Sequence, residues 1–135
     1  MKTKMSIISS LAMILFLSVS AMAQSDSKVI AVINHAEWCS VCKNNGERAQ
    51  AAFMENNKDG TIQFIANDLT DEASKRKSAV ALKEAGLDKV MAEKKGTGTA
   101  YFFDAETKEL ITRISVAKSN EELADAVVTA KKGAK

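Results

Sequence analysis

Residues 29–33 form an uninterrupted apolar run, Val-Ile-Ala-Val-Ile, in which four of the five side chains are β-branched. A strand with one face in water alternates apolar and polar residues, so a run without alternation indicates a strand buried on both faces. A sheet that contains such a strand needs a layer of helices on each side, and this requirement favours an α/β architecture.

The rest of the chain supplies the other elements of that architecture. Composition and turn signals predict a helix at 41–56, a strand at 62–66, a helix-rich segment at 70–95 that is split at Gly86, strands at 100–103 and 110–114, and a final helix. Ser119 and Glu122 form the capping box that opens this last helix. The order β-α-β-α-β-β-α predicts a central mixed β-sheet flanked by helices, in which the first two strands are parallel and the last two form a hairpin.

The first 23 residues differ from the remainder and are predicted to be a signal peptide, residues 1–23. Lys2 and Lys4 give a basic start, residues 7–19 carry no charge, and Ala21-Met22-Ala23 places small residues where a signal peptidase cleaves. The apolar stretch is shorter than a membrane-spanning helix. A retained amphipathic anchor is the alternative, but the segment has no polar face. We therefore expect a periplasmic or secreted protein, cleaved near Ala23.

The predicted mature chain, residues 24–135, is a single domain of balanced charge. Loss of the two leader lysines changes the net charge from +2 to a balance of 17 basic against 17 acidic residues. A neutral chain lacks the electrostatic footprint of a nucleic-acid-binding protein. We expect no nucleic-acid partner and a monomeric state.

The strongest candidates for reactive side chains are two cysteines, Cys39 and Cys42, which lie between the first predicted strand and the following helix. A thiol at a helix N-terminus faces unpaired N–H groups and the positive end of the helix dipole, both of which stabilise a thiolate. A thiol three residues further on lies on the same helical face and is placed to attack a mixed disulfide. The spacing favours a redox-active pair with one nucleophile and one resolving thiol.

Two other interpretations of the cysteine pair remain open. A purely stabilising disulfide that closes four residues contributes only about 1.9 kcal/mol, against about 4.7 kcal/mol for a loop of roughly 100 residues. A metal site would use His35 as a third ligand, whereas a closed zinc site takes four. Redox chemistry is favoured over both.

The motif Glu-Trp-Cys-x-x-Cys-Lys at 37–43, directly after a buried strand, resembles the active-site segment of thioredoxins. The predicted element order is similar to the minimal thioredoxin fold, so the resemblance implies a thioredoxin-like fold over residues 28–131. It further implies that Cys39 is the exposed nucleophile, that Cys42 is the more buried resolving thiol, and that Trp38 belongs to the surface that meets the partner protein.

The same resemblance assigns the loop that faces the disulfide. Thioredoxins carry a cis-proline there, and alignment places Gly98 at that position with Thr97 before it. A glycine lets the backbone approach a bound peptide closely. Thr97 and Gly98 are therefore predicted substrate-binding residues.

Three charged or titratable neighbours are predicted to modulate the thiols. The buried acid that assists proton transfer in thioredoxins falls at Ile33, which holds no proton, so Glu37 with water is the predicted replacement. Lys43 either adds positive potential near the thiolate or is a solvated helix lysine. His35 is either a surface residue beside the site or a modulator that changes the local charge near neutral pH.

Together these observations predict a thiol–disulfide oxidoreductase of the cell envelope that exchanges disulfides with protein thiols through Cys39 and Cys42. The disulfide itself is the redox group, with no organic cofactor and no metal. A reducing role in an oxidising compartment requires a membrane electron-transfer partner. The alternative is a non-catalytic binding module on the same scaffold, or a copper or zinc carrier.

Overall fold

The computed structural model describes residues 27–135, so the predicted leader at 1–23 lies outside the described residues. The elements follow in the order β1 (Val29–His35), α2 (Ser40–Glu55), β2 (Ile62–Asp68), α3 (Glu72–Glu84), α4 (Asp88–Met91), β3 (Thr99–Asp104), β4 (Leu110–Ser115) and α5 (Asn120–Gly133). This is the predicted order, with the segment before β3 divided into α3 and α4 at Gly86, whose φ is +74°.

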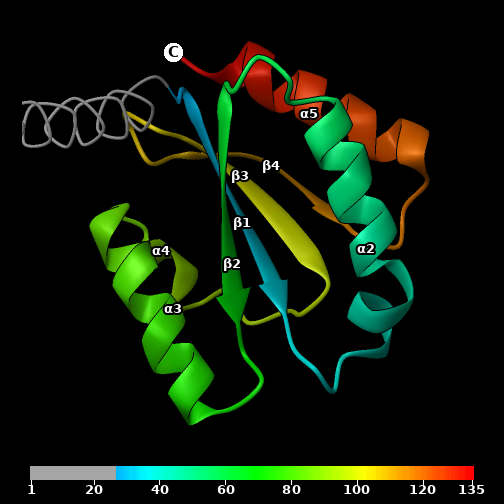
Figure 1. Ribbon diagram of the computed structural model, residues 1–135. Helices are drawn as coiled ribbons and strands as arrows, with labels where there is room; N and C mark the ends of the chain where they lie inside the picture. The colour runs from blue at the N-terminus through cyan, green and yellow to red at the C-terminus, as the bar shows by residue number, and fades with distance from the viewer. Residues whose placement is uncertain (1–26) are drawn as a thin grey trace, which may run out of the picture.

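The four strands form one mixed sheet in the order β2-β1-β3-β4. β1 pairs with β2 in parallel and with β3 in antiparallel orientation, and β3 and β4 form the predicted hairpin. Helices α2 and α5 cover one face of the sheet, and α3 and α4 cover the other (Figure 1). The predicted α/β class and the flanked mixed sheet are confirmed.

The central strand β1 explains why its sequence is apolar throughout. Val29 and Ala31 point into the core formed with α2 and α5, and Ile30 and Val32 point into the core formed with α3 and α4. All four residues are buried. A polar side chain at any of these positions would enter an apolar core without a hydrogen-bond partner, at a cost of several kcal/mol.

Both parallel strands continue two residues beyond their predicted ends, and the extra residues are polar. The register places Asn34 beside Asn67 and His35 beside Asp68. The carboxyl ends of β1 and β2 lie at the same edge of the sheet, where the chain enters α2 (Figure 1). This edge therefore carries a cluster of polar side chains directly before the cysteines.

Helix ends are set by side-chain caps. Ser119 and Glu122 form the predicted capping box of α5. Asp71 caps α3, since its carboxylate accepts a hydrogen bond from the Ser74 N–H at 2.8 Å. Asp68, at the end of β2, does not cap this helix, because its carboxylate accepts hydrogen bonds from Thr70.

Within residues 27–135, we find no helix whose length and hydrophobicity would allow it to cross a bilayer.

Candidate active site

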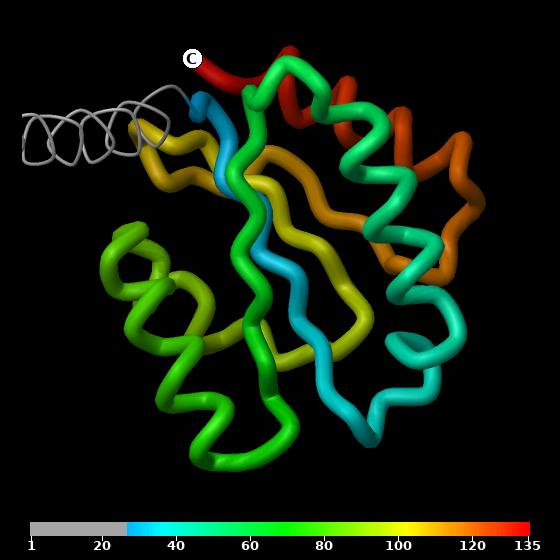
Figure 2. The backbone as a smooth tube through the Cα atoms, in the orientation of Figure 1, coloured from blue at the N-terminus to red at the C-terminus, as the bar shows by residue number. Residues whose placement is uncertain are grey.

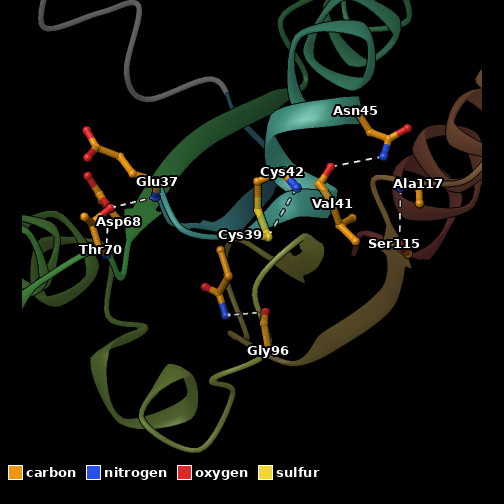
Figure 3. The surroundings of a disulfide bond; sticks show 11 residues. Glu37, Cys39, Val41, Cys42, Asn45, Asp68, Thr70, Gly96, Ser115 and Ala117 are labelled. Carbon is orange, nitrogen blue, oxygen red and sulfur yellow. Dashed lines mark hydrogen bonds between the residues drawn. A yellow bond between two sulfur atoms is a disulfide. The ribbon is translucent and has the colours of Figure 1, made fainter.

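Cys39 and Cys42 are joined in a disulfide at the junction of β1 and α2 (Figure 3), with their Cα atoms 5.3 Å apart. β1 ends at His35, and four residues later Cys39 serves as the N-cap of α2 in extended conformation. The predicted placement of the pair, after a buried strand and at the start of a helix, is confirmed.

The Cys39 sulfur performs the capping function itself. Its Sγ accepts a hydrogen bond from the Cys42 N–H at 3.2 Å, and its carbonyl accepts one from the Lys43 N–H at 3.1 Å. The first amides of a helix have no partner within the helix, so they favour an acceptor with negative charge. When the disulfide opens, this position stabilises a thiolate on Cys39.

The relative burial of the two cysteines is the reverse of the one that the resemblance implies. Cys39 is buried, with 6% of its surface exposed, whereas Cys42 is half-buried. The physical reason is the loop opposite the disulfide. A Cβ atom placed on Gly98 would lie 3.8 Å from the Cys39 Sγ and 2.9 Å from the Val41 Cγ1, so this loop covers Cys39 at close range.

Gly98 is held in a conformation that suits glycine. Its φ is +77°, its N–H donates to the Asn34 carbonyl at 2.8 Å, and its carbonyl accepts from the Val116 N–H at 2.9 Å. No peptide bond between residues 27 and 135 is cis. Thr97, which is half-buried, precedes it. Gly98 therefore lies against the disulfide, as the alignment of the loop predicts.

Asn34 anchors this loop, although no sequence motif marks it as a site residue. The side chain is fully buried, and its Nδ2 donates to the carbonyls of Lys94 at 2.7 Å and Gly96 at 3.2 Å. Its Oδ1 accepts from the Asn67 Nδ2 at 2.8 Å. Figure 2 follows the backbone from α4 into β3, and Figure 3 draws the hydrogen bond that the Gly96 carbonyl accepts. The Asn34 amide thus fixes the loop that covers Cys39.

Cys42 borders two hollows that lie side by side. The outer hollow, of about 420 Å³, is lined by His35, Ala36, Glu37, Cys42 and Lys43. The inner cavity, of about 440 Å³, lies between α2 and the sheet, and its apolar lining includes Ile33, Ala49, Phe53, Met54, Phe64 and Val116. Cys42 and His35 line both. The three predicted modulating residues therefore all lie around Cys42 rather than Cys39.

His35 is paired with a carboxylate across the strands. Its Nε2 lies 3.8 Å from the Oδ2 of Asp68, its neighbour in the parallel register. The other carboxylate oxygen of Asp68 accepts hydrogen bonds from the hydroxyl and the N–H of Thr70. These two hydrogen bonds lower the pKa of Asp68, and the charge of His35 lowers it further. The carboxylate next to His35 is therefore ionised and fixed in place.

Trp38 and Glu37 both donate hydrogen bonds to Thr70. The Trp38 Nε1 donates to the Thr70 carbonyl at 3.1 Å, and the Glu37 N–H donates to the Thr70 Oγ1 at 3.0 Å. The Trp38 side chain is nevertheless 63% exposed. Glu37 lines the outer hollow, and its carboxylate points away from the sulfur atoms (Figure 3).

Among residues 27–135, no group of three or more His, Cys, Asp or Glu side chains is arranged to hold a metal ion. His35 is paired with Asp68, and both cysteines are in the disulfide.

No family model matches the sequence, and no curated protein matches it by sequence. Solved structures do match. StoA from Bacillus subtilis superposes with a TM-score of 0.50 at 13% identity, covering 75% of this chain and 83% of its own. Trxlp from Edwardsiella tarda EIB202 gives a TM-score of 0.49 at 17% identity, covering 82% and 91%. Thioredoxin from Wuchereria bancrofti gives 0.49 at 17% identity, covering 82% and 86%.

The likeness to StoA, at this low identity, concerns the fold alone. Combined with the strand order and the Trp-Cys-x-x-Cys segment at the β1–α2 junction, it establishes a thioredoxin-like fold for residues 27–135. The resemblance expected from the motif is confirmed at this level.

Proposed function

We propose that this protein is a thiol–disulfide oxidoreductase whose redox group is the Cys39–Cys42 disulfide. The observation that carries the proposal is the hydrogen bond from the Cys42 N–H to the Cys39 Sγ, which places one sulfur at the helix N-terminus. A disulfide that serves only to stabilise has no need of this position, and closing four residues contributes only about 1.9 kcal/mol.

In the proposed reaction the Cys39 thiolate attacks a substrate disulfide and forms a mixed disulfide, and the leaving thiolate departs. The Cys42 thiolate then attacks the Cys39 sulfur, the bond to the substrate breaks, and the second substrate thiolate is released. Two electrons pass from the cysteine pair to the substrate disulfide. The reverse sequence oxidises a substrate dithiol, so the direction depends on the potential of the partner.

Protein thiols and disulfides are the proposed substrates. Trp38, Thr97 and Gly98 are the proposed substrate contacts: the exposed Trp38 ring offers a peptide an aromatic surface, and the Thr97–Gly98 loop packs against the disulfide. Glu37, Lys43 and His35 surround Cys42 and are proposed to tune it.

The proposed location is the periplasm or the exterior, with residues 1–23 removed and the monomeric domain 24–135 as the working protein. The leader composition supports this location. If the protein works as a reductant there, it requires a membrane electron-transfer partner to restore its thiols.

Insulin reduction by dithiothreitol tests the proposal, with the wild type compared with Cys39→Ser. We expect the wild type to accelerate insulin precipitation and Cys39→Ser to match dithiothreitol alone. Asp125→Asn, an exposed substitution on α5 remote from the disulfide, is the control and should match the wild type. Indistinguishable traces for the wild type and Cys39→Ser would refute the catalytic role.

A further inference from the structure

We propose that His35, held by Asp68, accepts the proton of the Cys42 thiol when that thiol attacks. This inference deepens the proposed function, because it assigns the proton transfer in the resolving step to a named side chain. The arrangement that supports it is the position of His35 on both hollows that reach Cys42, together with its cross-strand contact to a fixed carboxylate.

The resolving step needs a proton acceptor close to Cys42. A thiol ionises with a pKa of about 8.5 in water, so most of it is protonated at neutral pH, and only the thiolate attacks a disulfide. The first helix amides do not serve Cys42 as they serve Cys39, because the N–H of Cys42 is itself directed at the Cys39 sulfur. Cys42 must therefore be deprotonated by a neighbouring group.

Three titratable or charged side chains line the outer hollow with Cys42, and they differ in their ability to accept a proton at neutral pH. Lys43, on α2, is a cation at neutral pH and has no lone pair to accept a proton. Glu37, between β1 and α2, points its carboxylate away from the sulfur atoms, and carboxylates are weak bases at neutral pH. An imidazole changes protonation between pH 5 and 8, which is the range suited to general-base catalysis.

Of these three groups, His35 is the one that lines both hollows together with Cys42. It lines the inner cavity together with Cys42, where the neighbouring sheet residues Ile33, Phe64 and Ala66 carry no titratable group. It lines the outer hollow as well, which is open to solvent. A proton accepted from Cys42 therefore has a route from His35 to water.

Asp68 acts as a positioning residue. The parallel register sets it beside His35, and the two hydrogen bonds from Thr70 hold its carboxylate while the second oxygen stays 3.8 Å from the His35 Nε2. The Asp68 carboxylate is therefore proposed to hold the His35 ring in position beside the two hollows. The proton balance is complete: the Cys42 S–H bond breaks, an N–H bond forms on His35, the new S–S bond joins Cys39 and Cys42, and the departing substrate thiolate takes up a proton from water.

The test uses Cys39→Ser, in which Cys42 is the single thiol of the chain. Its attack on 5,5′-dithiobis(2-nitrobenzoate) is followed by release of thionitrobenzoate from pH 5 to 9, with His35 present and with His35→Ala added. We expect His35→Ala to slow the reaction at pH 6.5 by at least about tenfold. Added imidazole should restore most of the rate, as it replaces a missing base but does not repair altered packing.

Asp68→Asn in the same background should lower the rate at pH 6.5 by a smaller factor, of about threefold, while Asp125→Asn should leave it unchanged. Unfolding midpoints of all variants verify that each is folded. Superimposable pH profiles with and without His35, or a loss that imidazole does not recover, would overturn the assignment. Because this reaction needs no turnover of a protein substrate, its failure is distinct from failure of the insulin assay.

Discussion

The N–H of Cys42 donates a hydrogen bond to the Sγ of Cys39 over 3.2 Å, so one cysteine of the pair caps the helix that carries the other. This relationship makes the two sulfurs chemically unequal even though they are three residues apart. Cys39 receives the electrostatic stabilisation of the helix N-terminus, and Cys42 is the sulfur that borders the hollows.

The rate at which Cys39 is alkylated in the Cys42→Ser variant measures how far the helix N-terminus stabilises the Cys39 thiolate. An ordinary thiol gains about 50-fold in rate between pH 6.5 and 8.5, because its thiolate fraction rises by that factor. We expect a gain of less than about tenfold for Cys39, since the helix N-terminus already favours its thiolate at pH 6.5. The same variant unfolded in urea is the control and should show the ordinary gain. An ordinary gain in the folded protein would contradict the role of the helix.

Substitutions at Gly98 test the close packing of the loop against Cys39. Gly98→Ala should cost more than about 2 kcal/mol of unfolding free energy, since the new Cβ adds a 2.9 Å contact with Val41 to the strain of a positive φ. Gly60→Ala is a matched control: its φ is +72° with nothing within 4 Å, so it isolates the backbone cost of about 1 kcal/mol. If urea unfolding shows the same loss of unfolding free energy for Gly98→Ala and Gly60→Ala, the close contact between residue 98 and Val41 is contradicted.

Gly98→Pro should not stabilise the protein, although thioredoxins carry a proline there. The φ of Gly98 is +77°, which a proline ring does not permit, and its N–H is used in a hydrogen bond to Asn34. We expect a loss of at least about 1 kcal/mol in the same unfolding experiment. A gain in stability would mean that the loop adopts a different backbone from the one described.

Asn34→Leu tests the anchor of the loop. The substitution leaves the carbonyls of Lys94 and Gly96 and the amide of Asn67 without their partner, and each buried orphan costs about 1 to 3 kcal/mol. We expect a loss of at least about 2 kcal/mol in urea unfolding, together with faster alkylation of reduced Cys39 as its cover loosens. Asn44→Leu, at an exposed site on α2, should change stability by less than about 0.5 kcal/mol.

Lowering the pH should weaken the hydrogen bonds by which Asp104 joins the β3–β4 turn to the C-terminus. Three backbone N–H groups, of Thr107, Lys135 and Glu106, lower the pKa of the buried Asp104 from its ordinary value of 3.8 to about 2. A lowered folded-state pKa contributes stability above pH 4 that is lost as the pH falls through 2. The difference in unfolding free energy between wild type and Asp104→Asn should therefore shrink from pH 5 to pH 2. A constant difference would contradict this linkage.

The sequence predicts the architecture well because its strongest signals are local. The apolar run at 29–33 defines the central strand, and the helix after it forces parallel pairing with the next strand. The strand ends are less predictable. Asn34 and His35 look like loop residues, yet they extend β1 because Asn67 and Asp68 stand beside them on β2.

The site is only partly predictable for a similar reason. The position of the cysteine pair follows from the motif, and the alignment finds Gly98. The importance of Asn34 does not follow, since the carbonyls it binds lie 60 and 62 residues later and carry no signature of their own. The expected burial of the cysteines is wrong because it depends on how closely that distant loop approaches Cys39.

The reduction potential of the Cys39–Cys42 disulfide tests the redox role most directly. The single tryptophan, Trp38, is adjacent to the pair and provides a fluorescence signal for equilibration in glutathione buffers, with alkylation of the released thiols as the independent readout. We predict a potential between about −270 and −120 mV, the range of catalytic pairs. A potential below about −300 mV, typical of structural disulfides, would contradict a redox role for this protein.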